Sequence, residues 1–130
     1  MSISILVLGA PFESQSCFTA FRFVEAALAM NVKVERVFFY QSAVHTASSL
    51  SCTPRDEFDL YTAWRSLKQK YNLDLVVCIA AAARRAVIDS SEAKRHNKPA
   101  HNMSDSFVLS GLGQLVEAIA TSDKLITFGE

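Results

Sequence analysis

The feature that most limits how this chain can fold is a short apolar run in its second half. Residues 73–80 read Leu-Asp-Leu-Val-Val-Cys-Ile-Ala, and no polar residue interrupts the run after Asp74. Parallel strands covered by helices on both faces have this near-continuous apolar pattern, whereas half-exposed strands alternate apolar with polar residues. We therefore expect residues 73–80 to form a buried strand of an α/β sheet.

Four other segments have the apolar, β-branched composition of strands, and they are residues 3–8, 32–40, 107–109 and 124–128. The segments between the strands are long enough for the crossovers that parallel pairing needs. The predicted fold is a three-layer α/β sandwich with a four- to five-stranded, mostly parallel sheet. A chain of 130 residues without a repeat or a composition shift is typical of one domain, expected here over residues 1–130.

Two longer helices are predicted from capping residues and from apolar residues at helical spacing. The first begins at Ser14 or Ser16 and ends near Asn31. The second begins at Thr53, because residues 53–56 combine a capping hydroxyl, a proline at the first helical position and an acid in the first turn. It ends at Asn72, and its apolar stripe is formed by Leu60, Trp64, Leu67 and Tyr71.

Two further helices and one loop complete the prediction. A short helix follows Asp89 and includes the basic residues 94–96. Ser110 opens the last helix, and one face of this helix is formed by Leu112, Leu115, Val116 and Ile119. Residues 41–51 are small and polar without clear periodicity, so we expect a loop with one helical turn at most.

Charge and cysteine usage exclude several classes of protein. Thirteen basic residues balance thirteen acidic ones, so no overall field draws the chain to nucleic acid or to an anionic membrane. A charge-driven partner must use a local patch, and the candidate is the basic cluster Arg84, Arg85, Lys94, Arg95 and Lys98. The three cysteines form no zinc-type spacing and cannot all pair, and no basic leader begins the chain. These features indicate a reducing cytosol.

Cys78 is the strongest candidate for chemistry, because reactive groups of such sheets gather at the carboxyl ends of the strands. Four alanines and then Arg84 and Arg85 follow it. Small residues leave access, and a helix N-terminus and two guanidinium groups stabilise a thiolate. A cysteine between two β-branched residues also fits a purely structural role in the core. Cys17 at a helix start is interpreted as packing, and Cys52 as an exposed loop thiol.

Other catalytic or binding constellations are weak in this sequence. His45, His96 and His101 are dispersed and form no ligand pair, so no metal site is predicted. A hydrolase that pairs Cys78 with His45 remains an alternative, although no third orienting group is evident. The first loop, residues 9–14, matches neither GxGxxG nor a P-loop, and no cofactor is expected.

Residues 77–85, Val-Cys-Ile-Ala-Ala-Ala-Ala-Arg-Arg, resemble the active-cysteine segment of the TusD/DsrE family of sulfur-relay proteins. Three more blocks occur in the family's order, and they are Val-Phe-Phe-Tyr at 37–40, Asp-Glu-Phe-Asp-Leu at 56–60 and Ser-Gly-Leu-Gly at 110–113. The resemblance covers essentially the whole chain. One departure is Ala86, where the family's double arginine is followed by glycine.

The resemblance implies a cytoplasmic sulfurtransferase subunit that takes sulfane sulfur as a persulfide on Cys78 and hands it to an acceptor cysteine. Arg84 and Arg85 would support the thiolate or dock a partner. In the TusD branch, TusB/TusC-like subunits complete a hetero-hexamer, a TusA-like protein donates sulfur, a TusE-like protein accepts it, and the product is the 2-thiouridine of tRNA. In the DsrE branch, DsrF/DsrH-like subunits and a DsrC-like acceptor serve sulfur oxidation. A non-catalytic structural subunit is a further alternative. Neither direct nucleic-acid binding nor a membrane partner is implied.

Overall fold

The computed structural model describes residues 1–129 and contains one five-stranded sheet in which every neighbouring pair of strands is parallel. The strand order is β4-β3-β2-β1-β5. The strands are β1 (Ser2–Val7), β2 (Lys33–Phe39), β3 (Leu75–Cys78), β4 (Val108–Ser110) and β5 (Lys124–Phe128). The predicted parallel α/β sandwich is therefore confirmed, with five strands.

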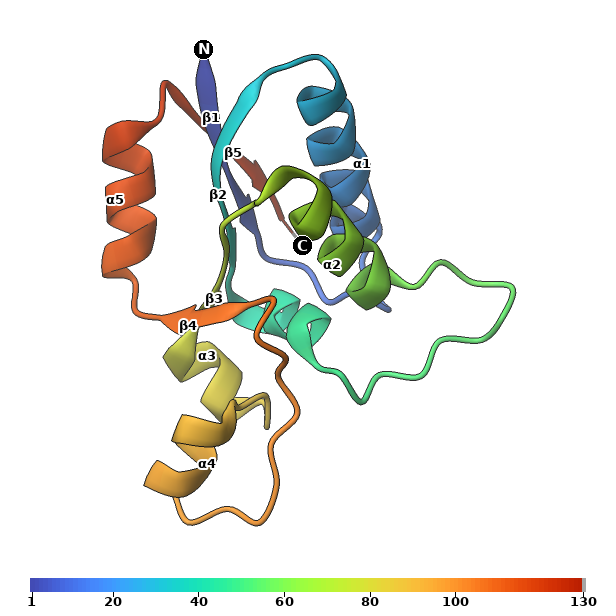
Figure 1. Cartoon of the computed structure of the whole chain (residues 1–130), viewed down its shortest axis with the longest axis vertical. Helices are drawn as coiled ribbons and strands as arrows, with labels where there is room; N and C mark the ends of the chain where they lie inside the picture. The colour runs from blue at the N-terminus through green and yellow to red at the C-terminus, as the bar shows by residue number, and fades with distance from the viewer. Residues whose placement is uncertain (130) are drawn as a thin grey trace.

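Helices lie on both faces of this sheet (Figure 1). Helices α1 (Gln15–Ala29) and α2 (Leu60–Tyr71) cover one face, and α5 (Gly113–Thr121) covers the other. Two short helices, α3 (Ile79–Arg84) and α4 (Ser90–Arg95), lie beyond the carboxyl end of β3, and a 3₁₀ helix, η1 (Gln41–Ala47), follows β2. Within residues 1–129, no helix is both long enough and apolar enough to cross a membrane.

The main core lies between the sheet and the α1–α2 layer. Trp64 of α2 meets Phe21 of α1 and Phe39 of β2 edge to face, with ring centroids 5.1 Å and 5.4 Å apart. Edge-to-face pairs of this kind contribute about 0.5 to 1.5 kcal/mol each beyond the area that they bury. Trp64, a member of the apolar stripe from which α2 is predicted, therefore lies at the centre of the core.

The predicted start of α2 at Thr53 is wrong. Residues 54–59 are exposed, and the helix begins only at Leu60, where Asp59 Oδ1 accepts a hydrogen bond from Thr62 N at 3.1 Å. The capping signals near Thr53 form a turn instead, in which Glu57 N donates to Pro54 O. Residues 53–59 offer little to bury against the sheet, so the helix begins where its apolar stripe begins.

The last helix also differs from the prediction. Ser110 ends β4 rather than opening the helix, and α5 begins at Gly113. Ala118 is the buried residue of α5, whereas Leu112, Val116 and Ile119 are exposed. The predicted apolar face therefore points largely away from the sheet, because an outward-facing stripe has the same spacing as a core-facing one.

Smaller differences concern the segments around β2 and β3. The predicted strand 73–80 is shorter, because Ile79 and Ala80 already belong to α3. The predicted loop 41–51 contains seven residues of 3₁₀ helix, of which Ala43, Val44, Thr46 and Ala47 are buried. The predicted helix after Asp89 is confirmed, since Asp89 Oδ1 accepts from Glu92 N at 2.9 Å.

Candidate functional site

Cys78 is the last residue of β3 and the N-cap of α3, so it lies at the carboxyl edge of the sheet as the sequence predicts. Its register partner on β4 is Ser110. The thiol is buried, with 3 % of the residue exposed. Among residues 1–129, no side-chain hydrogen bond to Cys78 Sγ is present, and its side chain does not cap α3. The thiol is therefore held by packing alone.

The residues after Cys78 form a short helix of small side chains. Ala81 and Ala82 are buried against the core, whereas Ala80, Ala83 and Arg84 are exposed on the other side of α3. Arg85 Nη1 donates to Ala81 O at 3.1 Å, and neither Arg84 nor Arg85 forms an ion pair within residues 1–129. Their guanidinium charges therefore remain available for an anion that approaches α3.

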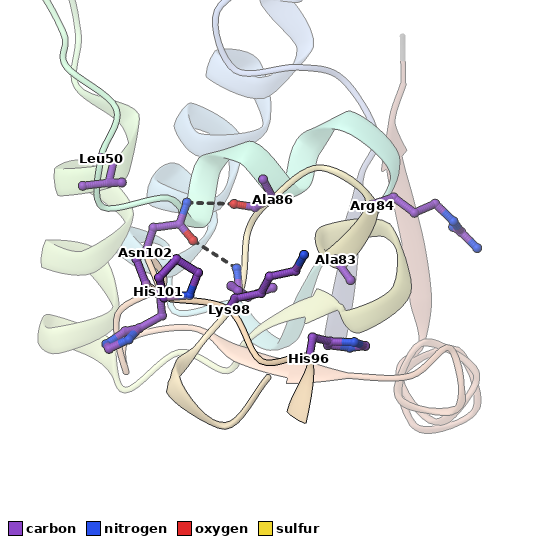
Figure 2. A pocket seen from close by; sticks show the side chains of 11 residues that line it. Leu50, Ala83, Arg84, Ala86, His96, Lys98, His101 and Asn102 are labelled. Carbon is purple, nitrogen blue, oxygen red and sulfur yellow. Dashed lines mark hydrogen bonds between the residues drawn. The ribbon is translucent and has the colours of Figure 1, made fainter. Parts of the chain in front are cut away.

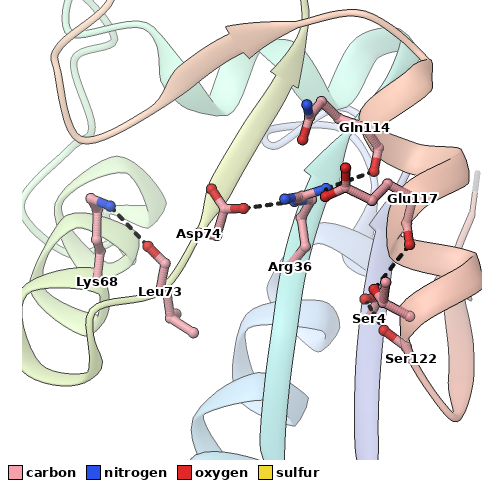
Figure 3. Close-up of polar contacts among 9 residues, drawn as sticks. Ser4, Arg36, Lys68, Leu73, Asp74, Gln114, Glu117 and Ser122 are labelled. Atoms are coloured by element: carbon pink, nitrogen blue, oxygen red, sulfur yellow. Dashed lines mark hydrogen bonds and ion pairs between the residues drawn. The ribbon is translucent and has the colours of Figure 1, made fainter.

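Two hydrogen-bonded contacts hold the amino end of β3 (Figure 3). Arg36 Nε of β2 binds Asp74 Oδ2 at 2.6 Å, and Lys68 Nζ of α2 donates to Leu73 O at 2.8 Å. Arg36 Nη1 also donates to Gln114 O and lies 3.3 Å from Glu117 Oε1, which attaches α5 to the sheet. The strand that ends at Cys78 is thus fixed from both faces of the sheet.

The other two cysteines have different surroundings. Cys17 is buried in the first turn of α1, and its Sγ donates to Gly9 O at 2.6 Å. Burial raises the pKa of the Cys17 thiol to about 11, and this outweighs the opposite effect of the Thr46 hydroxyl. Cys52 is exposed in the loop before α2. Cys17 therefore stays protonated near neutral pH, and Cys52 is an accessible surface thiol.

His45 is half-buried in η1, which packs against α3. No hydrogen bond joins His45 to Cys78 among the described residues, so the dyad that a Cys-His hydrolase needs is not assembled. Within residues 1–129, no group of three or more His, Cys, Asp or Glu side chains could hold a metal ion.

The connection between α3 and α4 explains the glycine that the family resemblance calls for at position 86. Ala86 has a φ of 61°, in the left-handed region that glycine adopts without a steric cost. Asn102 holds this turn, because its Nδ2 donates to Ala86 O and to Ser48 Oγ, and its Oδ1 accepts from Ile88 N, each at 3.0 Å. Asn102 is a positioning residue that the sequence did not reveal.

A groove of about 540 Å³ lies beside this turn, and we call it the α3–α4 groove. Its apolar lining comes from Leu50, Ala83, Ala86, Ile88, Pro99 and Ala100, and its polar lining from Arg84, His96, Lys98, His101 and Asn102 (Figure 2). Residues from three separate segments meet here, and two dispersed histidines of the sequence, His96 and His101, belong to the same groove. The groove starts at the carboxyl end of α3, one short helix away from Cys78.

Known proteins with similar sequences cover nearly all of this chain. A sulfurtransferase TusD homolog from Pseudomonas aeruginosa is 49 % identical over 119 residues, which are 92 % of this chain and 91 % of that protein. A protein from Allochromatium vinosum with the provisional name sulfurtransferase DsrE is 39 % identical over 130 residues, the full length of both. A sulfurtransferase TusD from Serratia proteamaculans is 40 % identical over 124 residues, 95 % of this chain and 96 % of that protein.

The fold has a counterpart among solved structures. The crystal structure of the ychN protein from E. coli superposes with a TM-score of 0.78 and covers 98 % of this chain and 99 % of that chain, at 20 % sequence identity. The model of the DsrE/DsrF-like family matches residues 1–128. With relatives up to 49 % identical over most of its length, the chain belongs to the DsrE/DsrF-like family.

Proposed function

We propose that this chain is a sulfurtransferase subunit that accepts sulfane sulfur as a persulfide on Cys78 and passes it to a cysteine of an acceptor protein. The observation that carries the proposal is the place of Cys78 at the carboxyl end of β3, in a chain whose relatives bear sulfurtransferase names. Arg84 and Arg85 support the anionic sulfur or contact the partner. The reaction needs one cysteine and neither a metal nor a general base.

The transfer is an exchange of one sulfur–sulfur bond for another. The Cys78 thiolate attacks the outer sulfur of a donor persulfide, and the bond between that sulfur and the donor cysteine breaks. The donor leaves as a thiolate, the outer sulfur keeps its proton, and Cys78 becomes the persulfide without net oxidation. The second transfer repeats this step with the acceptor thiolate as the nucleophile. First-turn N–H groups of α3 have no helical partner and can stabilise negative charge on the sulfur.

The destination that we propose is the 2-thiouridine of tRNA in the cytoplasm, with a TusA-like donor and a TusE-like acceptor. This branch is favoured by the 49 % identity to a TusD homolog. A DsrE-type role in sulfur oxidation, with a DsrC-like acceptor, is the second candidate, favoured by the full-length match to the protein named DsrE. Reconstituting thiolation of tRNA with donor, acceptor and modifying enzyme would distinguish the two.

We further propose that the chain works in a hetero-hexamer with related small subunits of the TusB/TusC-like or DsrF/DsrH-like kind. The exposed stripe formed by Leu112, the N-cap of α5, and by Val116 and Ile119 of α5 supports this, because adjacent exposed apolar side chains are typical of an interface. Light scattering should give an assembly when the chain is co-expressed with its related subunits. A monomer under those conditions would contradict the hexamer.

The burial of Cys78 favours one competing role, a non-catalytic subunit of the same assembly. The chain offers internal standards for this question, because Cys52 is exposed and Cys17 is buried and hydrogen-bonded. In native protein treated with iodoacetamide, a catalytic Cys78 should react much faster than Cys17. Equal, slow alkylation of Cys78 and Cys17 would support the non-catalytic role.

The experiment that tests the proposal directly is intact-mass analysis after incubation with a cysteine desulfurase and its sulfur carrier. The wild type should gain the mass of one sulfur atom, and a reductant should remove it. The Cys17→Ala, Cys52→Ala double variant should gain the same mass, whereas Cys78→Ser should gain none. An adduct of equal yield on folded Cys78→Ser would reject the assignment.

A further inference from the structure

We propose that the α3–α4 groove binds an acidic, extended segment of the protein that exchanges sulfur with Cys78. In this segment, carboxylates flank at least one apolar side chain. The inference rests on the proposed function, because that function makes the occupant a sulfur partner. It adds a recognition site that residues 96–102, after α4, form together with the end of α3, so Arg84 is one part of a larger site.

The charge of the surrounding segment points to an acidic ligand. Residues 79–104 contain five arginine and lysine residues but only two acidic residues, although the net charge of the whole chain is zero. Both acids are already engaged. Asp89 caps α4, and buried Glu92 lies 3.4 Å from both Arg95 Nη1 and His96 Nε2. Lys98 forms no ion pair within residues 1–129, so its charge is not neutralised locally.

The shape of the groove fits a chain segment rather than a small inorganic anion. Its walls are largely apolar, and no acidic residue lines it. Figure 2 shows Lys98 reaching across the groove toward Ala83, with Arg84 turned outward from the opposite wall. An apolar side chain can lie on Ile88 and Pro99 while neighbouring carboxylates meet Lys98 and His101. A volume of about 540 Å³ holds a few side chains, which matches an extended segment.

The position of the groove connects this binding to Cys78. The groove starts at Ala83 and Arg84, and Cys78 caps the other end of the same helix. Six helical residues span about 9 Å, which three or so residues of extended chain can cover. Exposed Ala80 and Ala83 lie along one face of α3 and leave room for that chain.

The lining favours a protein segment over RNA as the occupant. Recognition of single-stranded RNA uses aromatic platforms on which bases stack, and no Phe, Tyr or Trp lines the groove. A protein segment can place an apolar side chain on the apolar walls and carboxylates beside Arg84 and Lys98 at the edge of the groove. A sugar–phosphate chain supplies only the negative charge.

The binding test uses the full chain and fluorescence anisotropy. The probe is a fluorescein-labelled nonapeptide with one leucine between two Asp-Glu pairs, and the same peptide with lysines in place of the acids is the comparison. We expect Lys98→Glu to weaken binding of the acidic peptide at least tenfold. Lys94→Glu makes the same charge change on an exposed α4 residue outside the groove, and it should change binding less than threefold. Unchanged melting temperatures would confirm that both variants are folded.

Three outcomes would overturn the groove assignment. The first is equal weakening by Lys98→Glu and Lys94→Glu, which would indicate unspecific charge attraction. The second is equal binding of the lysine peptide. The third is tighter, Lys98-dependent binding of an oligouridine dodecamer, which would make the ligand RNA.

A separate measurement keeps the proposed function distinguishable from the groove assignment. Glutathione persulfide should load Cys78 equally in the wild type and in Lys98→Glu, because this small donor does not need the groove. Loading without Lys98-dependent peptide binding would reject the groove alone. Lys98-dependent binding without any loading of Cys78 would reject the proposed function and the link to sulfur, while supporting a site for acidic segments.

Discussion

Cys17 and Cys78 occupy comparable places, since each lies where a strand of the sheet passes into a helix. They are equally inaccessible, with 2 % and 3 % of each residue exposed. Cys17 Sγ donates a hydrogen bond to Gly9 O, whereas no side-chain hydrogen bond to Cys78 is present among residues 1–129. Exposure therefore does not distinguish the two thiols, and their hydrogen bonding does.

The helices that follow the two cysteines differ as well. Cys17 belongs to a helix of 15 residues that packs against three strands and α2. Cys78 precedes a helix of six residues, four of them alanine, that ends at the positive φ of Ala86. A short helix with small side chains has less packing to lose when it moves, so the Cys78 junction is the better suited to open for a partner. This difference supports a packing role for Cys17 and a chemical role for Cys78.

The largest expected effect is on the rate of sulfur transfer. Cys78→Ser should reduce transfer to an acceptor at least about 1,000-fold, because a serine hydroxyl is not ionised near pH 7 and forms no persulfide. Cys17→Ser should keep near wild-type transfer when the protein is folded. Persulfide-specific alkylation of the acceptor measures both rates. Loss of transfer in a folded Cys17→Ser protein would reverse the roles of the two cysteines.

The second expected effect is a dependence of stability on pH that comes from Cys17. The pKa of the Cys17 thiol is raised to about 11 by burial, whereas a thiol of the unfolded chain ionises near pH 8.5. Above that pH the unfolded state loses a proton that the folded state keeps, so stability falls as pH rises. The folded protein should lose roughly 2 to 3 kcal/mol from this group by pH 11.

Urea unfolding between pH 7 and 11 measures this effect as the difference between wild type and Cys17→Ala. Other groups that titrate in this range contribute similarly to both proteins and largely cancel in the difference. A difference that stays constant across this range would show that burial does not hold the Cys17 proton.

The third prediction concerns Gly9, which accepts the hydrogen bond from Cys17. A Cβ at this position would lie 2.5 Å from Ser14 Oγ and 2.7 Å from Ser14 Cβ, so the turn must shift. Gly9→Ala should lower the free energy of unfolding by about 1 to 3 kcal/mol, which is the usual cost of overpacking. Gly111→Ala is the matched control, because nothing lies within 4 Å of its Cβ. Equal stability of the two variants would mean that the Cys17 turn is not tightly packed.

Much of the fold could be predicted because local patterns and tertiary burial agree. Residues 75–80 are apolar whichever way their side chains point, and the four residues of β3 are all buried between β4 and β2. The prediction failed where local signals and burial disagree. The cap at Thr53 is a strong local signal, but Leu60 is the first residue after the cap that is buried in the core.

The candidate site was predictable only in part for a related reason. A strand end marks Cys78 in the sequence, because the carboxyl edge of a parallel sheet is a general location for function. No sequence pattern predicts the α3–α4 groove. Its lining residues are far apart in the sequence, and the hydrogen bonds of Asn102 hold their segments together. Long-range contacts of one amide side chain leave no periodicity to recognise.

The smallest expected effect is a stabilisation at the Cys78 junction. The φ of 61° is sterically unfavourable for Ala86 but not for glycine, although glycine loses more backbone entropy on folding. Because the steric cost is the larger of the two, Ala86→Gly should raise the free energy of unfolding by about 0.5 to 1 kcal/mol. None of the residues between β1 and α1 has a positive φ, so the Cys17 junction offers no comparable gain.

Ala83→Gly is the control for this prediction, because Ala83 is exposed like Ala86 but lies inside α3. There glycine should lower stability by about 0.5 to 1 kcal/mol, so the same chemical change three residues apart should have opposite signs. Urea unfolding of the two variants and the wild type measures this reversal. A loss of stability in Ala86→Gly would mean that the left-handed turn after α3 is unstrained, and the strain would then not distinguish the Cys78 junction from the Cys17 junction.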